Sequence, residues 1–415
     1  MFGEAKQCRI CGNSELVSIV NLGRQSLTGV FPKSRDQPVT AGPLELVKCT
    51  GTDVCNLVQL RQSYDLGEMY GLNYGYRSGL NRSMVEHLNE LVGRIRAVAD
   101  PKPGDLVIDI GSNDSTLLQA YPKDGPTLVG IDPTGTKFKQ YYPSHIELIP
   151  EFFSANAVNR RFGARKAVAI SSIAMFYDLE SPIDFMHQIR EVLADDGIWL
   201  FEQSYMPTML DVNAYDTICH EHLEYYGLAQ IKWMTDRAEL KIIDVWLNNA
   251  NGGSFAVMVA KTGSRYPEAT AKIVAILRDE AMRGLHTLAP YAEFKARIFE
   301  HRARLAAFIA ETKRAGKTIL GYGASTKGNV ILQFCNLTAA DIPAIAEVNE
   351  DKFGCFTPGT YIPIISENEA RATKPDYFLV LPWHFKQTII ERERDYVAGG
   401  GTLVFPLPAI EALAK

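Results

Sequence analysis

The densest group of titratable side chains is the run from Cys219 to His222, which reads Cys-His-Glu-His. A histidine can take up a proton near neutral pH, and a nearby carboxylate can orient it and stabilise its charged form. The run follows a predicted strand, at the sheet edge where open α/β folds bind ligands. We therefore predict that His222 is a general base oriented by Glu221, and the alternative is a solvated turn. A metal site is disfavoured because adjacent residues cannot all face one ion.

Four of the seven cysteines lie in the first 60 residues. Cys8 and Cys11 have the two-residue spacing of a zinc knuckle, whereas Cys49 and Cys55 form a wider pair. Four thiolates can close a tetrahedral zinc site, which would stabilise a segment too small to build a large core. Structural Zn²⁺ is the prediction, and small buried hydrophobic cysteines are the alternative.

A single-glycine loop follows a predicted strand in the middle of the chain. Residues 106–110 are an apolar run typical of a buried parallel strand, and Asp109, Gly111 and Asn113 lie at its end. Glycine allows a close approach of the backbone to a ligand, and residues 115–118 can open a helix with free amide donors. A dinucleotide fingerprint needs three glycines, so NAD is disfavoured. The loop instead predicts the S-adenosylmethionine site of a class I methyltransferase.

Further polar and aromatic residues complete this predicted cofactor site. Asp132 ends the next strand, 127–132, where a carboxylate bonds ribose hydroxyls in Rossmann-type sites, although it could instead be a turn or cap residue. The segment 151–153 could line the adenine, although adjacent aromatics are more often half core and half surface. The residues assigned to the cofactor are Asp109, Gly111, Asn113, Asp132, Glu151, Phe152, Phe153 and Ser171.

The apolar spacing predicts the elements that hold these sites. An amphipathic helix is expected at 81–98, before the central strands, and a charged helical stretch at 267–314, interrupted near 288–290. Alternating strands and helices between them predict a doubly wound α/β domain. A second, smaller Rossmann-like domain is expected from residue 317 onward. Further strands are predicted at 167–171, 197–202, 241–245, 255–261, 345–348, 377–381 and 402–405.

A second glycine turn, 321–327, reads Gly-Tyr-Gly-Ala-Ser-Thr-Lys. Hydroxyls and a cation at a helix start suit a diphosphate, but the Walker spacing is missing, so no nucleoside triphosphatase is predicted. Ordinary turn chemistry is the alternative. Tyr322 and Lys327 are assigned to the substrate, together with Cys219 and His220.

The composition excludes some classes of protein. The formal net charge is -5 and no Lys/Arg stripe is present, so nucleic acid is not the expected partner. No apolar run approaches the roughly 20 residues that span a bilayer, and the start of the chain lacks a signal pattern. We expect a cytoplasmic protein, with a small-molecule substrate and a monomeric state, whose cysteines do not form disulfides.

The order of these motifs resembles the nucleotide-sugar C-methyltransferases, which include the sugar C-3′ methyltransferases of branched deoxysugar synthesis. The resemblance spans nearly the full chain. It rests on the cysteine pairs, Val58-Gln59-Leu60, a Tyr-rich loop, the loop at 108–114, Glu221-His222, Gly252-Gly253-Ser254 and Gly321-Tyr322-Gly323-Ala324.

The resemblance implies three domains. These are a zinc-binding domain at 1–75, a methyltransferase domain at 76–265, and a helical connector with a C-terminal nucleotide-sugar-binding domain at 266–415. It also implies that Cys8, Cys11, Cys49 and Cys55 ligate zinc, that His222 is the base with Glu221 beside it, and that Tyr76, together with Tyr74, lies near the sugar.

The chain departs from the family pattern at three places. The second cysteine pair is wider, Cys219-His220 replaces a frequent Tyr-Asp, and Phe176 or Tyr177 stands where some relatives carry a histidine. These differences indicate a different sugar rather than a different reaction.

The expected reaction is methyl transfer from S-adenosylmethionine to C3 of a nucleotide-linked 4-keto-6-deoxy sugar, because a neighbouring ketone makes that carbon acidic enough for His222 to deprotonate. The alternatives are O- or N-methylation of a similar ligand, and a binding or scaffold protein without turnover.

Overall fold

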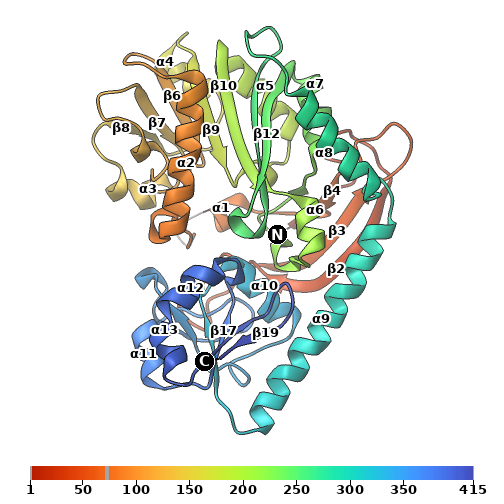
Figure 1. Cartoon of the computed structure of the whole chain (residues 1–415), viewed down its shortest axis with the longest axis vertical. Helices are drawn as coiled ribbons and strands as arrows, with labels where there is room; N and C mark the ends of the chain where they lie inside the picture. The colour runs from red at the N-terminus through yellow and green to blue at the C-terminus, as the bar shows by residue number, and fades with distance from the viewer. Residues whose placement is uncertain (1, 71–73, 415) are drawn as a thin grey trace.

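The computed structural model describes residues 2–70 and 74–414, so residues 71–73 of the Tyr-rich loop lie outside the described residues. Within this part the strands form four sheets, and helices cover the two larger ones (Figure 1). The mixed α/β class and the Rossmann-like parallel strands predicted from the sequence are confirmed.

The N-terminal segment contributes three strands to a four-stranded sheet. Its strands are antiparallel and follow the order β11-β4-β3-β2. The strand β11 belongs to the chain segment just after His222, so distant parts of the sequence build one sheet. The bounds are β2 Leu16–Ser26, β3 Ala41–Cys49, β4 Val58–Leu60 and β11 Glu224–Tyr225, beside a ribbon of β1 Phe2–Glu4 and β5 Gln62–Tyr64.

The central sheet has seven strands in the order β12-β13-β10-β9-β6-β7-β8. The strands β8, β7, β6, β9 and β10 are parallel, and β13 is antiparallel to both of its neighbours. All carboxyl ends of the parallel strands therefore meet at one edge. The bounds are β6 Leu106–Ile110, β7 Thr127–Ile131, β8 Ile146–Ile149, β9 Ala167–Ile173, β10 Leu193–Ser204, β12 Leu240–Asn248 and β13 Ser254–Lys261.

The C-terminal sheet follows the order β16-β15-β14-β17-β18-β19, with only β19 antiparallel. The strand β14, which comes first along the chain, leads directly into the second glycine turn, 321–327. The bounds are β14 Ile319–Tyr322, β15 Ile345–Glu347, β16 Ile364–Ser366, β17 Tyr377–Val380, β18 Thr402–Phe405 and β19 Glu411–Leu413.

Amphipathic helices cover these sheets. The predicted helix at 81–98 is α2, Arg82–Ala99; the Asn81 side chain caps it, and Leu88, Leu91 and Ile95 are buried. The long charged stretch is two helices, and α9 runs along one side of the molecule beside β2 (Figure 1). The other bounds are α1 Leu66–Met69, α3 Gly135–Phe138, α4 Ala155–Phe162, α5 Pro182–Val192, α6 Met206–Asp211, α7 Leu228–Arg237, α8 Thr270–Met282, α9 Ala289–Arg314, α10 Thr326–Phe334, α11 Glu367–Ala372, α12 Lys386–Arg392 and α13 Arg394–Ala398.

The apolar cores do not follow the three predicted segments. One cluster joins the N-terminal sheet, the 214–225 segment, α9 and the C-terminal sheet, and another joins the cysteine loops to the central sheet. The predicted boundaries at 75/76 and 265/266 stay predictions. Among the described helices, none is both long and apolar enough to cross a membrane.

Candidate active site

The loop after β6 lies at the carboxyl edge of the central sheet, where Gly111 is half-buried and Asn113 is buried. Gly111 has a φ of +73°, and a Cβ at this position would lie 3.2 Å from the side chain of Met175. A residue with a side chain would be both strained and crowded here. Behind the loop, Ser171 Oγ donates to Asp109 Oδ1 at 2.6 Å, and burial raises the pKa of Asp109 to about 7.

Asn113 and Asp132 connect the loop to the next strand and to the Tyr-rich segment. The Asn113 backbone N–H donates to Asp132 Oδ2 at 2.7 Å, and its side-chain amide donates to the Tyr76 carbonyl at 3.2 Å. Asp132 also accepts from the Thr134 backbone N–H at 2.6 Å. Asp132 therefore has the turn role that the sequence left open, while remaining at the strand end where ribose is bound in similar folds.

The helix expected at 115–118 is wrong. Asn113 and Ser115 have φ values of 50° and 62°, and only a short 3₁₀ helix, Leu118–Ala120, follows. The left-handed residues break the helical path, so the donors at this site belong to the loop itself and not to a helix N-terminus.

The segment after β8 divides between core and surface. Phe153 packs against Phe185, with ring centroids 5.0 Å apart, whereas Phe152 is 51% exposed and faces Tyr70 at 6.5 Å. Glu151 pairs with Arg160 at 2.9 Å on the surface. Of these three, Phe152 has the exposed ring that a ligand can contact.

His222 is held as a neutral imidazole, and one of its ring nitrogens has no hydrogen-bond partner among the described residues. Its Nδ1 lies 2.9 Å from the Thr217 carbonyl, which can only accept, so Nδ1 carries the proton and Nε2 keeps its lone pair. Its ring lies 4.2 Å from that of Tyr177. Burial, and then the positive charge of Lys327, lower the pKa of His222 to about 3.

Glu221 has a different partner from the one expected. The orientation of His222 by Glu221 is not observed, because Thr217 holds the imidazole and Thr28 Oγ1 donates to Glu221 Oε2 at 3.3 Å. Consecutive residues turn their side chains to different sides of the backbone. Burial raises the pKa of Glu221, and hydrogen bonds, including one from the Gly29 backbone, oppose that shift.

Three residues assigned to the substrate are enclosed by the fold. Cys219 and His220 are 0% exposed, and His220 packs edge-on against Tyr64 at 4.6 Å. The hydroxyl of Tyr322 lies 2.6 Å from Glu367 Oε1 and 2.9 Å from Glu393 Oε1. Neither kind of surrounding leaves room for a ligand, so these assignments to the substrate are corrected.

Lys327 and the Tyr-rich segment occupy the region between the two larger sheets. Lys327 Nζ, on α10, donates to the Asn251 carbonyl at 3.0 Å, in the turn between β12 and β13. Burial lowers the pKa of Lys327, and the charge of Asp216 opposes that shift. Lys137 Nζ donates to the Tyr74 carbonyl at 2.7 Å, and the Tyr76 side chain is 43% exposed. Among the described residues, these side chains do not form one bonded cluster.

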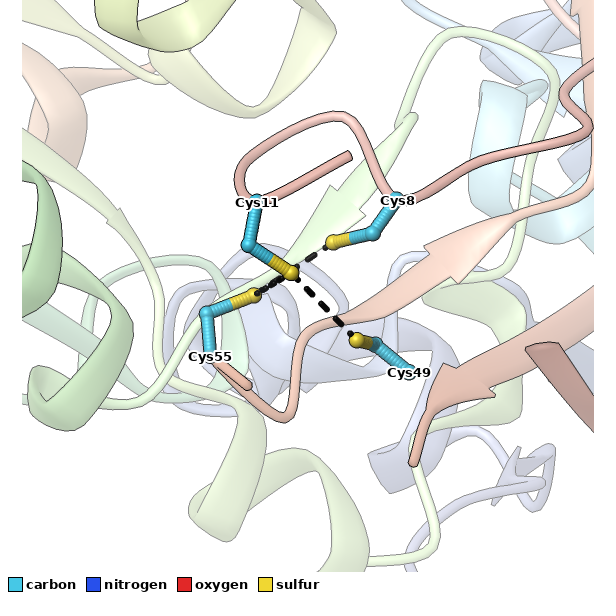
Figure 2. Close-up of side chains that lie close together, drawn as sticks. All are labelled: Cys8, Cys11, Cys49 and Cys55. Atoms are coloured by element: carbon cyan, nitrogen blue, oxygen red, sulfur yellow. Dashed lines mark hydrogen bonds between the residues drawn. The ribbon is translucent and has the colours of Figure 1, made fainter. Parts of the chain in front are cut away.

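The four N-terminal cysteines converge (Figure 2). Their sulfur atoms all lie within 4.8 Å of one another, and three of the separations are 3.3, 3.5 and 3.6 Å. With Zn–S bonds of about 2.3 Å, a tetrahedral site needs sulfurs about 3.8 Å apart, so the thiols fit zinc with little movement. All seven cysteines are free, and the wider second pair does not prevent convergence.

Comparisons with known proteins agree with this organisation. Residues 8–70 match the family described as "Putative zinc binding domain", residues 76–245 match "Methyltransferase domain", and residues 249–408 match "C-methyltransferase C-terminal domain". The C-methyltransferase NovU of Streptomyces niveus is 29% identical over 97% of this chain and 95% of its own length.

The chain combines the three domains that these family models describe. It is an S-adenosylmethionine-dependent methyltransferase with a zinc-binding domain, and the matched range 8–70 contains all four converging cysteines.

Solved methyltransferase structures align with part of this chain. A Clostridium acetobutylicum S-adenosylmethionine-dependent methyltransferase is 10% identical, with a TM-score of 0.33 over 43% of this chain and 92% of its own. The Streptomyces caelestis CcbJ methyltransferase is 12% identical, with a TM-score of 0.33 over 42% and 89%.

Two contacts in the C-methyltransferase site were not predicted from the sequence. The Thr217 carbonyl sets the tautomer of His222, and Tyr70 donates to Asp178 Oδ2 at 2.7 Å next to Tyr177. A backbone carbonyl has no signature in residue type, and Tyr70 and Asp178 are far apart in the chain. The nearest available signal was the departure at Phe176-Tyr177, which marked this segment as unusual.

Proposed function

We propose that this C-methyltransferase adds a methyl group to C3 of a nucleotide-linked 4-keto-6-deoxy sugar. The observation that carries the proposal is the state of His222. It is neutral and anchored through Nδ1, and its Nε2 has no hydrogen-bond partner within residues 2–70 and 74–414. The proposed enzyme acts as a cytoplasmic monomer on a small-molecule substrate.

The proposed chemistry begins with proton transfer. A carbon acid next to a ketone needs a base on one side and stabilisation of the enolate oxygen on the other. His222 Nε2 takes the C3 proton, and the resulting enolate forms the new bond from C3 to the methyl carbon as the methyl–sulfur bond breaks. When bound, S-adenosylmethionine supplies the electrophilic methyl group. Tyr76, with an exposed side chain, is proposed to donate to an oxygen of the sugar.

Lys327 is proposed to meet the diphosphate of the substrate. Its charge is one cause of the low pKa of His222. A bound anion beside Lys327 would offset that charge and raise the pKa of His222, because an opposing charge reduces the repulsion of the imidazolium. Substrate binding would then make the base stronger at the moment when it is needed.

The cofactor is proposed to lie over Gly111, with Asn113, Asp132 and Phe152 around it. The loop geometry permits close approach of a ligand, and Phe152 offers an exposed ring. Ser171 and Asp109 would support the loop from below, since they bond to each other and are 1% and 3% exposed.

A panel of dTDP- and GDP-linked 4-keto-6-deoxyhexoses, assayed with S-adenosylmethionine by mass spectrometry, tests the proposal. One added methyl group is expected, together with solvent deuterium at C3 when the cofactor is left out. A methylated product without exchange at C3 would instead identify O- or N-methylation. Absence of any product across the panel would reject the substrate class.

Replacement of His222 tests its role as base. His222→Ala should keep the affinity for S-adenosylmethionine and lose about 10²–10⁴-fold in turnover and in C3 exchange, as is usual when a general base is removed. His187→Ala, on the exposed surface of α5, is the matched control and should behave as wild type. Full turnover of His222→Ala would remove His222 from this role.

A further inference from the structure

Arg9 stands between two of the converging cysteines and points away from them. It lies between Cys8 and Cys11 in the chain, and its side chain is only 3% exposed. Its Nη1 donates to the Leu60 carbonyl at 2.6 Å, and its Nη2 donates to Ser63 Oγ at 2.8 Å. The guanidinium is therefore fixed on the N-terminal sheet by a planar set of donors.

The Nε atom of Arg9 lies near two carboxylates from the predicted methyltransferase segment, 76–265. Arg9 Nε lies 3.1 Å from Glu180 Oε2 and 3.8 Å from Glu224 Oε1. The side chain of Glu224 is 0% exposed, and neither of its oxygens has a hydrogen-bond donor at ordinary geometry among the described residues. Burial raises the pKa of Glu224, and the positive charge of Arg9 opposes that shift, so the charged form of Glu224 depends on Arg9.

These two carboxylates belong to the chain segments that carry Tyr177 and the proposed base, His222. Glu224 is two residues after His222, and Glu180 is three residues after Tyr177, whose ring lies 4.2 Å from that of His222. The backbone joins the same parts, because the Leu223 N–H donates to the Tyr177 carbonyl at 2.8 Å.

The cysteine-bearing unit makes further contacts with the segment that carries His222. The strand β11 pairs with β4, and the Leu60 N–H donates to the Leu223 carbonyl at 2.8 Å. Gln230 Nε2 donates to the Cys55 carbonyl at 2.8 Å, and the cysteines share one apolar cluster with the central sheet. The zinc-binding unit thus contacts the chain at several points just after His222.

We infer that Arg9 is a positioning residue, which transmits the rigidity of the cysteine cluster to the segment that carries His222 by pairing with Glu224 and Glu180. The inference rests on the proposed function for the role of His222. It gives the zinc-binding domain a task in the reaction beyond its own folding. Arg9 touches no reacting atom and would act only through the geometry of His222 and Tyr177.

Three variants of the full-length, zinc-loaded chain test the inference: Arg9→Met, Glu224→Gln and the double variant. Arg9→Met should lower kcat about 100-fold, because a displacement of about 1 Å at a reacting group can cost that much. The double variant should regain at least about tenfold of this loss, since no buried carboxylate is left without its cation and the remaining carboxylate, Glu180, is half-exposed. KM for S-adenosylmethionine should change less than about threefold in all three variants.

Hydrogen–deuterium exchange of residues 219–227 supplies a measurement that needs no sugar substrate. Exchange should be faster in Arg9→Met than in wild type and should be slowed again in the double variant. Zinc content and the affinity for S-adenosylmethionine, measured by metal analysis and calorimetry, should stay at wild-type values. Arg61→Met is the matched control, because Arg61 pairs with Glu45 on the same sheet at 2.9 Å, away from His222.

Wild-type exchange and wild-type kcat in Arg9→Met would overturn the inference. So would a loss of zinc or of cofactor affinity that parallels the loss of turnover, because Arg9 would then serve only general folding. If the sugar panel yields no substrate, the proposed function fails, while the exchange data still decide whether Arg9 holds the 219–227 segment.

Discussion

Gly29 lies next to the side chain of Glu221, so a substitution at Gly29 can move the Glu221 carboxylate without replacing it. A Cβ on Gly29 would lie 2.3 Å from Glu221 Oε1, whereas ordinary contacts begin at 3.4 Å. Gly29 is buried and its φ lies outside the left-handed range, so alanine adds no backbone strain. The Glu221 carboxylate must therefore retreat by about 1.1 Å.

Glu221 directly precedes the proposed base, His222, in the chain. Because a displacement of about 1 Å near a reacting group can cost about 100-fold, Gly29→Ala should lower turnover by about that factor. Affinity for S-adenosylmethionine, measured by calorimetry, should stay unchanged because Gly111 and Asn113 are untouched. Gly93→Ala is the matched control, since no atom lies within 4 Å of its added Cβ and alanine favours the helix by about 1 kcal/mol. Wild-type turnover in Gly29→Ala would show that turnover does not depend on the position of the Glu221 carboxylate.

Two further predictions concern the cofactor loop and acid stability. Gly111→Ala should weaken S-adenosylmethionine binding at least about tenfold in calorimetry, because alanine at φ +73° costs about 1–2 kcal/mol and would crowd Met175. The control is Gly316→Ala, at φ +68° with no neighbour within 4 Å, which should leave the affinity unchanged. Equal losses of affinity in both variants would contradict the reasoning. Burial lowers the pKa of His220 to about 3. Between pH 6.5 and 3, His220 is therefore protonated in the unfolded chain but neutral in the folded chain. The contribution of His220 to stability is therefore lost as pH falls from 6.5 towards 3, by about 2 kcal/mol at pH 5. Urea unfolding between pH 7.5 and 5 should show a smaller decline in His220→Gln than in wild type, and parallel curves would show that His220 does not titrate differently on folding.

Local sequence was sufficient to predict the elements that carry the cofactor. The strand predicted at 106–110 is β6, and the helix at 81–98 is α2 shifted by one residue, because apolar periodicity and the Asn81 cap act within a few residues. The cysteine spacing also led to the correct set of four thiols. Local sequence failed at 115–118, where contacts of the loop with Asp132 and Tyr76 prevailed over helix propensity.

Only the tertiary structure decided the environment of the candidate base. The sequence by itself determined that His222 and Glu221 are adjacent, that Gly111 follows a buried strand, and that the N-terminal thiols are numerous enough for zinc. It did not determine that Thr217 holds His222, that Thr28 meets Glu221, or that Arg9 lies beside Glu224. These partners come from distant segments and from backbone atoms. Together with burial, they set the pKa values of Glu221 and His222. Burial and long-range contact are properties of the folded chain, so no spacing of residues encodes them.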